Sequence, residues 1–123
     1  MNYWKSALLI GIVWGFWHAP IIFAGYNYPD TPVIGLLLMV GLTISMTPLI
    51  NLVRAKSGTI WTACLFHGTF NAAVGVSVAV LPNAPVVWKG ALGLGGILSF
   101  SILIIVLLKY IRPTHTIPAN DGL

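Results

Sequence analysis

Four apolar runs, each long enough to cross a lipid bilayer, leave this chain few alternatives for its fold. They cover about residues 6–25, 33–53, 59–82 and 90–108. A helix rises ~1.5 Å per residue, so about 20 residues cross the ~30 Å hydrocarbon layer of a membrane. Inside that layer the backbone polar groups must pair within their own segment. We therefore predict an all-α integral membrane bundle of about four transmembrane helices, which is part of a larger helical bundle.

Composition and charge agree with a membrane protein. Hydrophobic residues make up 58% of the 123 and charged residues only 7%, which is outside the range of soluble domains. No cluster of cations is dense enough to indicate nucleic-acid binding, so membrane lipid is the expected surrounding partner. The transmembrane domain is predicted over residues 1–112, followed by a polar tail over 113–123.

The distribution of cations predicts the orientation in the membrane. Lys89 stands alone on one side, whereas five cations lie on the other: Lys5, Arg54, Lys56, Lys109 and Arg112. Cytoplasmic loops carry the excess of Lys and Arg. Both termini and the loop between the second and third runs are therefore predicted to be cytoplasmic.

Three polar side chains lie inside the apolar runs, where polar groups are costly and usually functional. His18 and Asn71 are each about 18 Å from the cytoplasmic side and His67 about 12 Å, counted along the helices. His67 and Asn71 are four residues apart and share one helix face. Pro20 has no backbone N–H, so the helix is expected to loosen beside His18. A structural alternative is that these side chains only bond neighbouring helices together.

The matched depths predict that the first and third runs pack side by side around one cavity. Gly11 and Gly15 form a GxxxG pair, which lets helix backbones approach closely. We expect His18, His67 and Asn71 to face this cavity. The two imidazoles should be within about 12 Å of each other, the separation that one water and one scissile carbonyl can bridge.

Two short motifs resemble those of the CPBP intramembrane proteases, the CAAX-processing and bacteriocin-processing group that includes bacterial Abi-type proteins. The segment "WGFWH", residues 14–18, is similar to the family's FxxxH motif, and "HGTFN", residues 67–71, to its HxxxN motif. The lead-in "SGTIWTACLFH", residues 57–67, resembles the family's entry into that helix. The likeness covers residues 6–75, with Trp14 where the family has Phe. It implies an integral protein of the bacterial plasma membrane.

The resemblance also implies a chemistry, which is water-mediated hydrolysis of a peptide bond within the membrane. His18 and a glutamate would activate the water, and His67 and Asn71 would hold the oxyanion. The substrate would be a membrane-embedded or prenylated peptide. Two histidines without a carboxylate make a poor zinc site, so no cofactor is required, although a divalent metal stays open.

One family motif is missing, because the chain contains no glutamate and so cannot carry EExxxR; both of its acids, Asp30 and Asp121, are aspartates. We expect the chain to be the C-terminal portion of a longer protease whose missing N-terminal helices supply the glutamate. By this interpretation the parent is an enzyme and the chain alone is inactive. A degenerate, inactive member is the other interpretation.

Two rival functions stay open. A non-catalytic membrane binder, such as a bacteriocin-immunity protein, is favoured by the absence of a glutamate base. A bis-histidine haem protein would use His18 and His67 as axial ligands, but it gives Asn71 no role.

Overall fold

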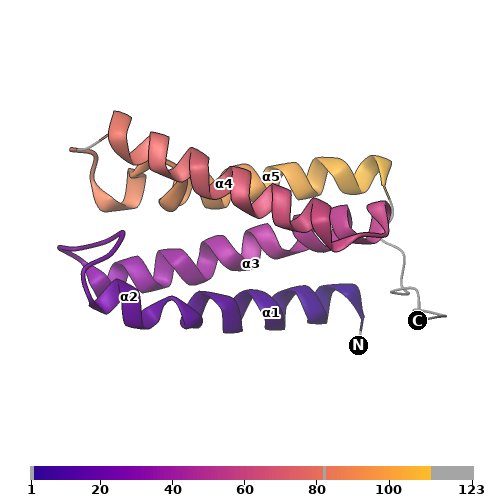
Figure 1. Cartoon of the computed structure of the whole chain (residues 1–123), viewed down its shortest axis with the longest axis horizontal. Coiled ribbons are helices and arrows are strands. Elements are labelled where there is room, and N and C mark those ends of the chain that lie inside the picture. Colours follow the sequence, from indigo (N-terminus) through magenta and orange to yellow (C-terminus); the bar gives the residue numbers. More distant parts are fainter. Residues whose placement is uncertain (1, 82, 112–123) are drawn as a thin grey trace.

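The computed structural model describes residues 2–81 and 83–111, and these form helices connected by short turns (Figure 1). The elements in chain order are α1 Tyr3–Trp17, α2 Ala19–Phe23, α3 Pro32–Ser57, α4 Ile60–Val80, the short 3-10 helices η1 Val86–Trp88 and η2 Gly90–Leu92, and α5 Leu94–Tyr110. No strand occurs in the described residues. The chain is an all-α membrane bundle, as predicted.

Three of the predicted membrane runs correspond to helices that are long and apolar enough to cross a bilayer. These are Tyr3–Phe23, which combines α1 and α2, and then α3 and α4. The fourth run is partly different, since its first residues form η2 and α5 begins only at Leu94. Gly90 has a φ of 54°, a left-handed conformation that suits a turn. The remaining apolar helix, α5, is therefore 17 residues long.

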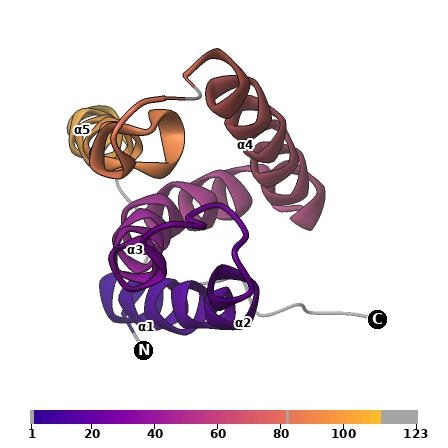
Figure 2. The same cartoon turned by 90° about the vertical axis from the view of Figure 1, so that its left-hand side faces the viewer.

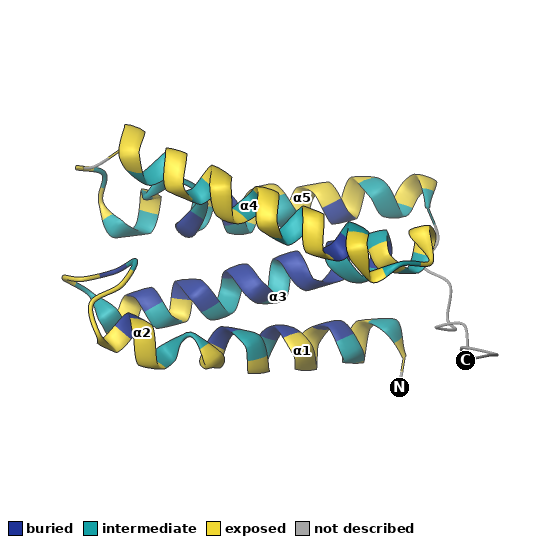
Figure 3. Ribbon diagram, in the orientation of Figure 1, coloured by how far each residue is buried: buried dark blue, intermediate teal, exposed yellow. Residues whose placement is uncertain are grey.

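Helix α3 is the centre of the bundle, and α1, α4 and α5 each pack against it. Figure 2 shows α3 between α1 and α4. Figure 3 shows that the buried residues concentrate on α3, whereas α4 is mostly exposed. The prediction that the first and third runs pack side by side is therefore wrong, because the second run separates them.

The GxxxG pair explains this arrangement, since its close partner is α3. A Cβ atom added to Gly11 would lie 2.7 Å from Cα of Ile44, and one added to Gly15 would lie 2.6 Å from Cα of Val40. Thr43 lies between these contacts and its hydroxyl donates to the carbonyl of Gly11 at 2.8 Å. The glycines pack helices closely, as predicted, but onto the second run.

The turn between α3 and α4 reverses the chain within a few residues. Gly58 ends α3 with a φ of 70°, and its N–H donates to the carbonyl of Arg54. Thr59 then caps α4, where its hydroxyl accepts from the N–H of Trp61. The Ser-Gly-Thr lead-in noted in the sequence is thus a C-cap followed directly by an N-cap.

The two ends of the bundle differ in charge. The start of α1, the α3–α4 turn and the end of α5 lie at one end, and the α2–α3 loop lies at the other (Figure 1). Lys5, Arg54, Lys56 and Lys109 belong to the first end, whereas Asp30 belongs to the second. Arg112, Asp121 and the predicted tail over 113–123 fall outside the described residues.

Candidate functional site

His18 lies at a break between α1 and α2. Its backbone N–H donates to the carbonyl of Gly15 instead of that of Trp14, and Pro20 has no N–H to offer the carbonyl of Phe16. The freed carbonyl of Trp14 lies 2.8 Å from Nδ1 of His18. The predicted loosening beside His18 is therefore present, and the imidazole itself satisfies one of the released backbone groups.

This hydrogen bond determines the tautomer of His18. A carbonyl oxygen can only accept, so Nδ1 carries the hydrogen. In the neutral imidazole Nε2 then keeps its lone pair. His18 can thus accept a proton or a hydrogen bond at Nε2 while its ring is held in place from the other side.

His67 and Asn71 form a pair on α4, as their spacing predicts. Nδ2 of Asn71 lies 3.3 Å from Nε2 of His67. An amide nitrogen only donates, so Nε2 of His67 accepts, and in the neutral ring the hydrogen is on Nδ1. The pair therefore leaves two donors for other groups: Nδ1–H of His67 and the second N–H of Asn71.

Trp14 joins the two histidines. Its ring centroid lies 6.1 Å from that of His18 and 5.0 Å from that of His67, with the His67 ring at 90° to the indole. The two imidazoles are thus no farther apart than the sum of these distances, which is within the limit expected from the sequence. Trp14 bridges α1 and α4 by its side chain, although the backbones of these helices are separated.

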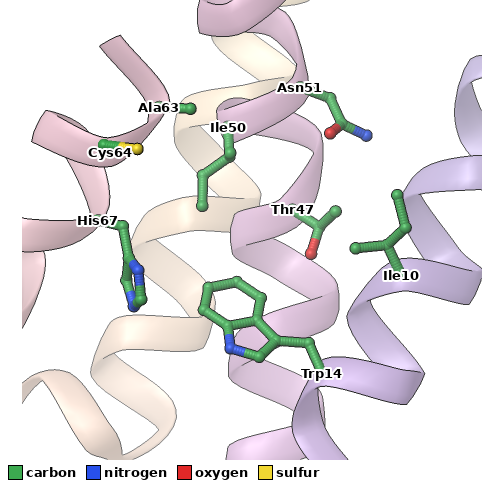
Figure 4. A pocket seen from close by; sticks show the side chains of 8 residues that line it. All are labelled: Ile10, Trp14, Thr47, Ile50, Asn51, Ala63, Cys64 and His67. Carbon is green, nitrogen blue, oxygen red and sulfur yellow. The ribbon is translucent and has the colours of Figure 1, made fainter. Parts of the chain in front are cut away.

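A cavity of about 250 Å³ lies beside this group, between α1, α3 and α4. Figure 4 shows the side chains that line it: Ile10, Trp14, Thr47, Ile50, Asn51, Ala63, Cys64 and His67. Of the three predicted site residues, only His67 lines this cavity. The expectation that all three share it is wrong, because His18 and Asn71 do not line it and Asn71, one turn past His67, is exposed.

The cavity also contains polar residues that the sequence analysis missed. Asn51 and Thr47 project into it from α3. The hydroxyl of Thr47 donates to the carbonyl of Thr43 at 2.6 Å. Both residues are polar side chains in an apolar run, which is the signal that singled out Asn71. Asn51 is near the end of its run, where polar residues are ordinary, so its type and position alone do not indicate a site.

The donors around Trp14 do not fit a resident metal or haem. Within residues 2–81 and 83–111, no three His, Cys, Asp or Glu side chains gather closely enough to hold a metal ion. Trp14 lies against both imidazoles, and Nε2 of His67 already accepts from Asn71. A haem between two axial histidines would need the space that the indole fills.

The fold and this site define a class of protein: a helical integral membrane protein with two half-buried imidazoles on either side of Trp14 and an exposed amide bonded to one of them. The family model for type II CAAX prenyl endopeptidase Rce1-like proteins matches residues 1–73. The chain belongs to this family, which confirms the resemblance seen in its motifs. The matched region contains His18, His67 and Asn71. No curated protein and no solved structure matches the chain.

Proposed function

We propose that this chain forms the imidazole half of an intramembrane endopeptidase that hydrolyses membrane-embedded or prenylated peptides. The observation that carries the proposal is the hydrogen bond between His67 and Asn71. It holds two side chains that carry N–H donors next to each other, and such donors can bind the oxyanion of a tetrahedral intermediate. Membership of the family supports the same chemistry.

The proposed reaction begins with a water that attacks the carbonyl carbon of the scissile peptide bond. A base takes one proton from this water while the new C–O bond forms and the carbonyl oxygen becomes an oxyanion. The bond between His67 and Asn71 must open when this oxyanion forms, because one oxygen cannot accept from both side chains while they are bonded to each other. An N–H of each side chain then donates to the oxyanion, and each donor is worth about 3–4 kcal/mol. The C–N bond then breaks, and the proton passes to the leaving nitrogen.

The proposed base is Nε2 of His18 acting with a carboxylate from outside this chain. The bond from Nδ1 to the carbonyl of Trp14 leaves that lone pair available. A neutral imidazole without a carboxylate is a weaker base, and general-base catalysis contributes about 10²–10⁴-fold. Asp30 lies in the loop between α2 and α3, seven residues beyond the end of α2 at Phe23. A membrane segment that is not among these 123 residues would supply the carboxylate, from the same polypeptide or from a partner.

We further propose that the protein is in a bacterial plasma membrane with both termini in the cytoplasm. The grouping of Lys5, Arg54, Lys56 and Lys109 at one end of the bundle supports this orientation.

The test is an assay in liposomes against a prenylated CAAX peptide. The 123-residue chain should not cleave it alone, and should cleave it when combined with a membrane segment that carries EExxxR. In the active combination, His67→Ala should lower the rate by about 10²–10³-fold, because one oxyanion donor is lost. Thr69→Ala, an exposed residue on the same helix, is the matched control and should leave the rate unchanged.

Two results would contradict this division of roles. Cleavage by the chain alone that is lost on His67→Ala would show that no added carboxylate is needed. Failure of every combination to cleave would favour the second candidate, a non-catalytic membrane binder, for which the absence of glutamate from the sequence is the specific observation.

A further inference from the structure

Asn51 is a half-buried polar residue that lines the cavity. Its side chain comes from α3, whereas His67 comes from α4, and the two stand on different sides of the cavity (Figure 4). Among the described residues no hydrogen bond joins the Asn51 side chain, while the neighbouring Thr47 hydroxyl is bonded within its own helix. A side-chain amide offers two donors and an acceptor. Asn51 can therefore bind a group that donates and accepts at once.

The rest of the lining restricts what that group belongs to. Ile10, Ile50, Ala63 and Trp14 give the cavity largely apolar walls. Its volume of about 250 Å³ is below the roughly 300–1,000 Å³ of pockets that enclose drug-sized ligands. A single aliphatic side chain with its attached peptide group meets both conditions.

A peptide group in a membrane is free to pair with Asn51 only when the peptide is not helical there. Within a helix every interior N–H and C=O is already paired, and an unwound segment in hydrocarbon leaves costly unpaired groups. The amide of Asn51 can donate to the carbonyl and accept from the N–H of such a segment. Asn51 and His67 are on different sides of the cavity. A peptide that spans the cavity would therefore place its scissile peptide group beside His67 and a neighbouring peptide group beside Asn51.

We propose that Asn51 is a substrate-binding residue that holds one peptide group of an unwound peptide, while an adjacent aliphatic side chain fills the cavity beside His67. The inference rests on the proposed function for its substrate class. It assigns to Asn51 a role in binding that is separate from the hydrolytic roles of His18, His67 and Asn71.

The chain carries its own reporter for this test. Cys64 is its single cysteine, is exposed, and lines the cavity. The rate at which N-ethylmaleimide alkylates Cys64 in nanodiscs should fall when a ligand fills the cavity. The probe is N-acetyl-leucine N-methylamide, which has one aliphatic side chain between two peptide groups. This assay measures binding alone and requires no cleavage.

The probe should protect Cys64 in the unmodified chain. Asn51→Leu, which keeps the size and removes the amide, should raise the probe concentration needed for half protection by about tenfold, the effect of roughly one net hydrogen bond. Asn51→Gln should recover part of the affinity, and Thr69→Ala should match the unmodified chain. If Asn51→Leu does not fold, Asn51→Ala removes the same bonds with less bulk.

Two outcomes would overturn the inference. One is absence of protection in the unmodified chain, and the other is equal protection in Asn51→Leu and the unmodified chain. The proposed function can fail separately. If protection of Cys64 depends on the Asn51 amide but the chain cleaves no peptide with any added segment that carries EExxxR, the binding site is kept and the protease is rejected. Conversely, cleavage that depends on His67 with KM unchanged by Asn51→Leu would keep the protease and reject the role of Asn51.

Discussion

Replacement of Gly11 by alanine is the sharpest test of the contact between α1 and α3. The added Cβ would lie 2.7 Å from Cα and 3.0 Å from N of Ile44, and 3.1 Å from the carbonyl oxygen of Thr43. These are backbone atoms, which cannot turn aside as a side chain can. Carbon atoms pack best about 3.5–4.0 Å apart, so α1 must move away from α3 by nearly 1 Å.

The expected cost follows from three contributions. Overpacking of this kind costs about 1–3 kcal/mol. The shift also weakens the 2.8 Å bond from the Thr43 hydroxyl to the carbonyl of Gly11, a loss of about 1 kcal/mol. Alanine favours a helix over glycine by about 1 kcal/mol, which offsets part of the loss. Gly11→Ala should therefore lower the free energy of unfolding by about 1–3 kcal/mol.

Gly68 provides the matched control, because nothing lies within 4 Å of the Cβ position there. Gly68→Ala on α4 should leave stability unchanged or raise it by up to about 1 kcal/mol, from helix propensity alone. The assay is reversible unfolding in bicelles, with both variants compared with the unmodified chain. If Gly11→Ala is no less stable than Gly68→Ala, α1 and α3 do not meet at Gly11 and the packing argument is refuted.

Three further predictions concern other parts of the bundle. Thr43→Val keeps the side-chain size but loses the bond to Gly11, and should cost about 0.6–1 kcal/mol in the same unfolding assay. A cysteine placed at Asn27 should react with a reagent added from outside the cell and one at Ser57 should not, in a background without Cys64; the reverse pattern would overturn the topology. Burial raises the pKa of Tyr28, so the folded state holds the phenol proton more tightly than the unfolded state does. The free energy of unfolding, measured against pH, should therefore fall as the pH rises above about 10, and Tyr28→Phe should lessen this fall.

The helices and their break could be predicted from the sequence because both are local properties. Hydropathy over about 20 residues identifies a membrane helix wherever it packs. The missing N–H of Pro20 weakens the helix beside His18 regardless of its neighbours. The spacing of His67 and Asn71 places them on one face and within hydrogen-bonding reach.

The lateral order of the helices could not be predicted in this way. Lipid tails are as apolar as leucine, so hydropathy does not say which helix a given face meets. Gly11 and Gly15 indicate a close approach, but they do not name the helix that approaches. The polar lining of the cavity depends on the same order, because Asn51 of α3 and His67 of α4 share it only where these two helices pack together.

The uneven coverage of the helices has a consequence for biosynthesis. Helix α3 buries half of its most apolar window and α4 only 6%. Because a chain is made from its N-terminus, α1 and α3 leave the ribosome before α4. Their glycine contact involves no later residue, so they can associate as a helical hairpin while α4 is still being made. In the native protein, amide protons of α3 should then exchange with solvent most slowly, and those of α4 should exchange sooner.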